Sequence, residues 1–84
     1  MTPPITPEAA RDLVRNALLK AIPDGELDRL DDREDFRDAL ELDSLDFLTF
    51  VEHLSNTSGI RIDDEDYDRL TTIQSSVDYL TSRG

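Results

Sequence analysis

Apolar residues recur in three stretches of the chain at steps of three and four, the spacing of one face of an α-helix. The first stretch follows Thr6-Pro7-Glu8, which places a capping hydroxyl before a proline at the first helical position. Pro23 should end this helix near Ile22. Its predicted buried stripe consists of Ala10, Leu13, Val14, Ala17, Leu18 and Ala21.

The second stretch runs from about residue 44 to residue 56, and the third opens after residues 71–72. Asp43 is expected to cap the second helix, because its carboxylate can accept backbone N–H groups that the first turn leaves unpaired. Gly59 is expected to close that helix with a left-handed turn. The predicted stripes are Phe47, Phe50, Val51 and Leu54 in the second helix, and Ile73, Val77 and Leu80, with Tyr79 alongside, in the third.

The connection at residues 23–43 is long for a compact domain, so we expect the core to hold it in place. Leu27 and Leu30 are spaced for a short helical turn, and Phe36 and Leu40 are also helix-spaced. A large aromatic side chain within a charged loop usually anchors that loop to the core.

Residues 60–62 alternate like a strand but have no partner strand, so we expect an extended linker with both isoleucines facing inward. Residues 63–70 are expected to form a short acidic helix anchored in part by Tyr67. The predicted fold class is all-α: a four-helix bundle with three long helices, one short helix and a long loop between helices one and two. We expect the 84 residues to form a single domain with flexible ends at 1–5 and 82–84.

Charge narrows the choice of partners. The chain holds 20 acidic and 9 basic residues, a net charge of −11, which disfavours nucleic acid and favours proteins with basic docking patches.

The chain contains no cysteine, so neither a disulfide framework nor a thiolate metal site is available. No apolar run approaches the ~18 residues of a membrane span, and the N-terminus does not have the form of a secretory signal. We expect a cytoplasmic monomer.

Ser44 is the residue best placed for chemistry. At the first position of the second helix its hydroxyl should point outward, where free N–H groups and the helix dipole favour an attached phosphate. A hydrolase triad is excluded, since the single histidine, His53, lies nine residues along the same helix, ~13 Å away at 1.5 Å per residue. We assign no catalytic residue and no metal site, because no acidic segment has the glycine placement of a calcium-binding loop.

Leu45 and Leu48 lie beside the buried stripe of this helix, with Glu52 one turn further along. Two interpretations are open. The leucines either form the fringe of the core, as single leucines usually do, or an exposed apolar lip next to Ser44 on which partners dock.

The sequence around Ser44 resembles the phosphopantetheine attachment motif of acyl carrier proteins, Leu-Gly-x-Asp-Ser-Leu, with Leu40-Glu41-Leu42-Asp43-Ser44-Leu45 here. Three further features are in register with it and extend the resemblance over most of the chain. They are Phe36, eight residues before the serine, the acidic stretch Ile62-Asp63-Asp64-Glu65-Asp66, and the ending Thr71-Thr72-Ile73-Gln74 with Val77-Asp78-Tyr79-Leu80.

The resemblance implies that Ser44 receives 4′-phosphopantetheine from coenzyme A through a phosphopantetheinyl transferase. The arm would hold acyl groups as thioesters and deliver them to acyl-transferring or acyl-modifying enzymes of fatty-acid, polyketide or related lipid biosynthesis, without catalysis by the carrier itself. Asp43 would hold the helix start and assist transferase recognition. The apolar interior would shelter the acyl chain. The implied docking residues are Leu45, Asp46, Leu48, Thr49 and Glu52.

Three positions depart from the family pattern. Glu41 replaces the usual glycine, Thr49 stands where many fatty-acid carriers have a glutamate, and Asp63 replaces a proline. A specialised carrier is therefore a strong alternative to the housekeeping one. Two other functions stay open: a peptidyl or aminoacyl carrier, although those more often have Gly-Gly-x-Ser, and an unmodified acidic helical adaptor.

Overall fold

The computed structural model describes residues 5–83, with the backbone alone for Arg83, and is helical with no strand in that range. Its three long helices are α1 (Pro7–Ala21), α3 (Ser44–Ser58) and α4 (Ile73–Arg83). They confirm the three predicted helices, although α3 extends to Ser58 rather than ending near Asn56. The shorter elements are the α-helix α2 (Phe36–Ala39) and the 3-10 helices η1 (Leu27–Arg29) and η2 (Asp64–Arg69).

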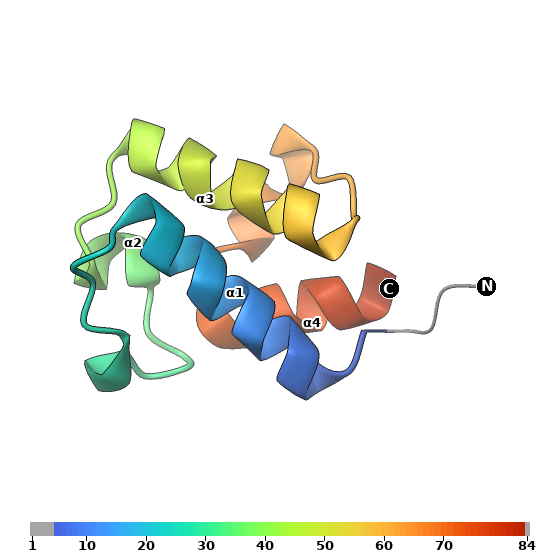
Figure 1. The fold of residues 1–84 in the computed structure, drawn as a ribbon, viewed down its shortest axis with the longest axis horizontal. Helices are drawn as coiled ribbons and strands as arrows, with labels where there is room; N and C mark the ends of the chain where they lie inside the picture. Colours follow the sequence, from blue (N-terminus) through green and yellow to red (C-terminus); the bar gives the residue numbers. More distant parts are fainter. Residues whose placement is uncertain (1–4, 84) are drawn as a thin grey trace.

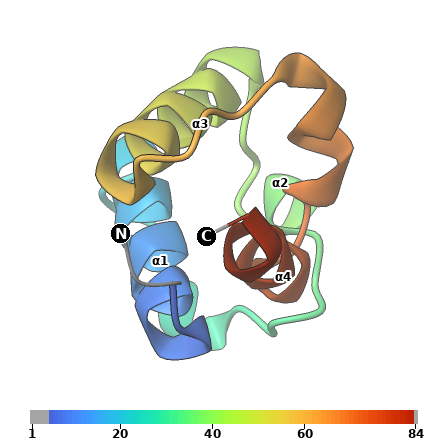
Figure 2. The same cartoon turned by 90° about the vertical axis from the view of Figure 1, so that its right-hand side faces the viewer.

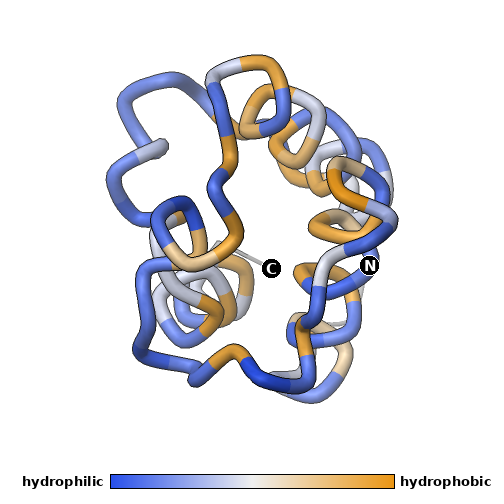
Figure 3. Tube along the Cα trace, turned by 90° about the vertical axis from the view of Figure 1, so that its left-hand side faces the viewer, coloured by the Kyte–Doolittle hydropathy of each residue, from blue (hydrophilic) through white to orange (hydrophobic). Residues whose placement is uncertain are grey.

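Helix α1 lies against both other long helices, and the core forms where the three meet (Figures 1 and 2). Each contributes the stripe that its spacing predicts, although Leu13 and Ala21 of α1 are only partly buried. The apolar segments of the trace lie mostly toward the interior in Figure 3. The all-α class is confirmed. The buried hydrophobic positions of the long helices are Ala10, Val14, Ala17, Leu18, Phe47, Phe50, Val51, Leu54, Ile73, Val77, Tyr79 and Leu80.

The termini of the helices follow local rules. Thr6 accepts a hydrogen bond from Ala9 N at 3.2 Å and so caps α1. Gly59, with φ of 74°, ends α3 in the left-handed conformation that glycine tolerates, and its N–H donates to Ser55 O at 3.0 Å. Thr6 and Gly59 are the residues that the sequence predicts for these two roles.

The connection between α1 and α3 is anchored to the core, as predicted, but it also contains α2, a helix that was not predicted. Leu27 in η1 and Phe36 in α2 are buried. Phe36 N donates to Thr71 O and Gln74 N donates to the carbonyl of Asp32, both at 2.9 Å, so the connection is bonded to the start of α4. Arg11 of α1 forms an ion pair with Asp32, and this hydrogen bond raises the pKa of Arg11.

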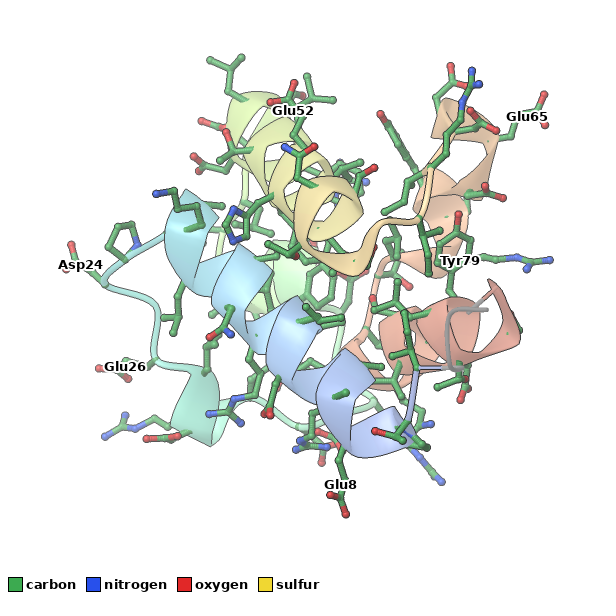
Figure 4. The ribbon with its side chains drawn as sticks, turned by 45° about the vertical axis from the view of Figure 1, so that its right-hand side comes forward. Glu8, Asp24, Glu26, Glu52, Glu65 and Tyr79 are labelled. Carbon is green, nitrogen blue, oxygen red and sulfur yellow. The ribbon has the colours of Figure 1, made fainter. Side chains whose placement is uncertain are left out.

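The segment between α3 and α4 runs from the extended linker, whose isoleucines pack against the core as expected, into η2. The short helix predicted at residues 63–70 is therefore of the 3-10 type. Tyr79 Oη donates to Asp66 Oδ2 at 3.0 Å and ties η2 to α4 (Figure 4).

At the chain ends, Ile5 packs against the core and α4 includes Ser82. The predicted flexibility of residues 1–4 and 84 falls outside the described residues.

Candidate functional site

The candidate site is the first turn of α3. Asp43 has extended backbone angles, and its Oδ1 accepts a hydrogen bond from Asp46 N at 2.8 Å. This bond satisfies one of the N–H groups that a helix start leaves unpaired and fixes where α3 begins. The structure confirms the predicted cap.

Ser44 is the first residue of α3, and its side chain is exposed. Within residues 5–83, no group hydrogen-bonds its hydroxyl. The hydroxyl therefore stands in solvent beside the positive end of the helix dipole. Both features fit a phosphate ester at Ser44, since the backbone N–H groups of the first turn favour an anion there.

The turn before Ser44 is tight because Glu41 adopts φ of 54°, the left-handed region that usually holds glycine. Leu42 N donates to Arg37 O at 2.9 Å, and the Leu42 side chain is only 8% exposed. The chain is thus pinned to α2 immediately before the cap. Glu41 thus has the left-handed backbone conformation that favours glycine, the usual residue at this position of the family motif.

Leu45 and Leu48 are exposed, at 74% and 42% of their surface. The structure therefore favours the apolar lip over the core fringe. Thr49 and Glu52 are also exposed, and Glu52 projects from the outer face of α3 in Figure 4. Asp46 is half-buried at the same end. The five predicted docking residues thus follow Ser44 along one helix.

Four aromatic rings pack between α2, α3 and η2, near the site. The Phe36 and Phe50 rings meet edge-on with centroids 5.2 Å apart, and Phe47 packs in the same way against Tyr67 of η2 at 5.3 Å. Phe47 also lies 6.0 Å from Phe50.

One neighbour of the site was missed by the sequence analysis. The guanidinium carbon of Arg37 lies 4.4 Å from the centroid of the Phe47 ring, within the range of a cation–π contact. An arginine in a charged loop carries no sequence signal for such a contact, because α2 and the start of α3 meet only through the tertiary fold.

One open hollow lies beside the turn that precedes α3, and another lies beside α3 itself. One of about 500 Å³ lies between the end of α1 and the turn before Ser44, lined by residues 21–26 and 39–41. The other, of about 350 Å³, lies between α3 and η2 and includes Val51, Ile62 and Tyr67. Both border exposed acidic side chains, Glu41 at the first and Glu52 at the second.

The described residues bring together neither Ser44 and His53 nor a cluster of metal-ligating side chains. His53 lies on α3 with Ser44, so the helix itself holds the two apart as predicted. Among the described residues, no three acidic or histidine side chains are grouped to hold a metal ion. No helix within residues 5–83 is long and apolar enough to cross a membrane.

Comparison with known proteins identifies the family of the chain. The model of the family described as "Phosphopantetheine attachment site" matches residues 12–80. An acyl carrier protein of Rubrobacter xylanophilus is 36% identical over 73 residues, covering 79% of this chain and 90% of its own length. An acyl carrier protein of Chlorobium phaeobacteroides is 32% identical over 56 residues, covering 67% of this chain and 72% of its own.

The fold is likewise shared with a solved structure. The solution structure of a candidate acyl carrier protein from Anaplasma phagocytophilum superposes with a TM-score of 0.83, covering 99% of this chain and 97% of that one. At 21% identity this likeness concerns the fold alone. The family match and the two relatives extend it to function: the chain belongs to the phosphopantetheine attachment family, as an acyl carrier protein with a covalent 4′-phosphopantetheine group.

Proposed function

We propose that Ser44 is the residue that bears the 4′-phosphopantetheine arm, donated by coenzyme A through a phosphopantetheinyl transferase. The observation that carries the proposal is the exposed Ser44 hydroxyl at the start of α3, inside the matched family region. In the transfer, the Ser44 oxygen bonds to phosphorus of the coenzyme A pyrophosphate. The phosphoanhydride bond breaks, the adenosine bisphosphate leaves, and the hydroxyl proton passes to a base of the transferase.

Asp43 supports this reaction by position. Its carboxylate is engaged with the Asp46 N–H, so it holds the first turn of α3 in register while Ser44 enters the transferase. Since Asp43 is also exposed, the transferase can contact it directly.

The docking surface for partner enzymes is proposed to consist of Leu45, Asp46, Leu48, Thr49 and Glu52. Exposed leucines flanked by carboxylates suit a partner with an apolar contact inside a basic patch, and the net charge of −11 would steer such a partner. These partners are acyl-transferring and acyl-modifying enzymes. Nucleic acid would be repelled by the same charge.

We further propose that the protein works as a cytoplasmic monomer in fatty-acid, polyketide or related specialised lipid synthesis. The acidic surface and the Asp-Ser-Leu sequence favour acyl over aminoacyl cargo. Many fatty-acid carriers have a glutamate at the position of Thr49, whereas this chain has a glutamate one turn later, at Glu52. This difference supports a specialised role.

Intact-mass measurement tests the attachment site. The purified chain is incubated with coenzyme A and a broad-specificity phosphopantetheinyl transferase, together with Ser44→Ala and the control Ser82→Ala, which removes another exposed serine hydroxyl. We expect the native chain and the Ser82 variant to gain one phosphopantetheine and the Ser44 variant to gain none. No gain in the native chain, with a transferase active on another carrier, would overturn the proposal in favour of an unmodified adaptor.

A further inference from the structure

Arg37 is a cation held at the start of α3 without a carboxylate partner among the described ion pairs. Arg11, Arg15, Arg29 and Arg61 each pair with an acidic side chain, whereas Arg37 packs against an aromatic ring. A guanidinium that packs against a ring can still donate its N–H groups to an anion, because the ring accepts none of them as a conventional hydrogen bond. Lys20, Arg33 and Arg69 also take part in none of the described ion pairs, so what distinguishes Arg37 is its contact with an aromatic ring.

Phe47 connects this cation to the turn of α3 that holds Ser44. Phe47 follows Ser44 by three residues, so the two side chains lie on neighbouring faces of α3 about one turn apart. Helical side chains lean toward the N-terminus, which brings the Phe47 ring toward the turn that holds Ser44. Arg37 lies over that ring at 4.4 Å.

The backbone of α2 fixes Arg37 there. Arg37 N donates to Asp35 Oδ1, and Arg37 O accepts from Leu42 N, both at 2.9 Å. The residue is thus tied to the cap of its own helix and to the chain just before Ser44. Figure 1 shows α2 and the first turn of α3 at the same end of the molecule.

We propose that Arg37 is a positioning residue for the phosphate esterified to Ser44: its guanidinium pairs with the phosphodiester and restrains the first atoms of the arm at the start of α3. Arginine suits this role because its planar donors match phosphate oxygens in a bidentate fashion. The inference rests on the proposed attachment at Ser44. The competing role is structural, a cover for the Phe47 ring, and it would act equally with and without the arm.

A comparison of apo and holo forms separates the two roles. Urea unfolding midpoints are measured for both forms of the native chain, Arg37→Gln, Arg37→Lys and the control Arg33→Gln, which removes the same charge from an exposed side chain four residues earlier. We expect attachment to raise the midpoint of the native chain and of Arg33→Gln. The rise should be lost in Arg37→Gln and reduced in Arg37→Lys. Lysine keeps the positive charge but lacks the planar guanidinium that can donate two parallel hydrogen bonds to a phosphate.

Phosphorus NMR of the same holo samples provides a second readout. The phosphodiester resonance should shift between the native chain and Arg37→Gln, and added salt should move it toward the Arg37→Gln position only where Arg37 is present. Equal midpoint rises in all variants, with an unchanged resonance, would overturn the role of Arg37. Intact masses are recorded first, so that the two proposals can fail separately. If all variants are modified but show equal midpoint rises, the attachment at Ser44 stands and the role of Arg37 is refuted. If the native chain is not modified, both proposals are refuted.

Discussion

Glu41 holds a strained backbone in the turn before Ser44, and its replacement by glycine is expected to stabilise the fold. A residue with a Cβ pays roughly 1–2 kcal/mol in the left-handed conformation, here φ of 54°. Glycine avoids that cost but loses roughly 0.4–1 kcal/mol of extra freedom on folding. The Glu41 side chain is exposed and takes part in none of the described ion pairs, so little else is lost.

The difference predicts a net gain of about 0.5–1 kcal/mol for Glu41→Gly. For a chain of this size that corresponds to a rise in melting temperature of roughly 2–8 °C. Thermal unfolding followed by circular dichroism measures it. Glu41→Ala is the control, because it removes the same charge and keeps the Cβ, and its stability should stay within about 0.5 kcal/mol of the native value.

The result that would refute this reasoning is an equal gain in both variants. Relief of charge repulsion, rather than of backbone strain, would then be the cause. A loss of stability in Glu41→Gly would also contradict it. The extra conformational entropy that glycine loses on folding would then exceed the strain that a Cβ causes at positive φ.

Four further outcomes are expected. Asp43→Ala should lose about 1 kcal/mol of stability in urea unfolding because the α3 cap is lost, with Asp43→Asn close to native; equal loss in both would refute the cap. Phe36→Ala should lose about 3–5 kcal/mol, enough to unfold much of so small a domain, and a fully cooperative native-like melt would contradict its role in the core. Leu45→Ala and Leu48→Ala should change stability by less than about 0.5 kcal/mol while weakening transferase binding measured by titration calorimetry; unchanged binding would remove the apolar lip from the docking surface. Moderate salt should raise the melting temperature by screening the net charge of −11 and lower the transferase's affinity, and salt-independence of both would argue against electrostatic docking.

The three long helices could be predicted because each carries a full apolar stripe and a local start or stop signal. Asp43 as cap and Gly59 as terminator act through their own backbone neighbours, so they are visible in the sequence. The position of Ser44 at the first turn of α3 follows from them. The role that we propose for Ser44 comes from the resemblance of its flanking residues to the family motif, which is also visible in the sequence.

Other features depend on contacts between distant residues. Helix α2 spans only Phe36–Ala39, too few residues for a periodic pattern, and it is held by a bond to Thr71. The exposure of Leu48 could not be decided from spacing, since the position borders the buried stripe. Arg37 reaches Phe47 only because α2 folds against α3.

The hydrogen bonds from Phe36 and Gln74 also bear on how the α1–α3 connection can vary in length. An insertion between residues 32 and 36 would pull apart the two bonds that join this segment to the start of α4, Phe36 to Thr71 and Gln74 to Asp32. The turn around Asp24 carries no such bond to α4 among the described contacts, and Asp24 points outward in Figure 4. Length changes in relatives of this chain should therefore collect near Asp24, leaving the spacing from Phe36 to the serine fixed.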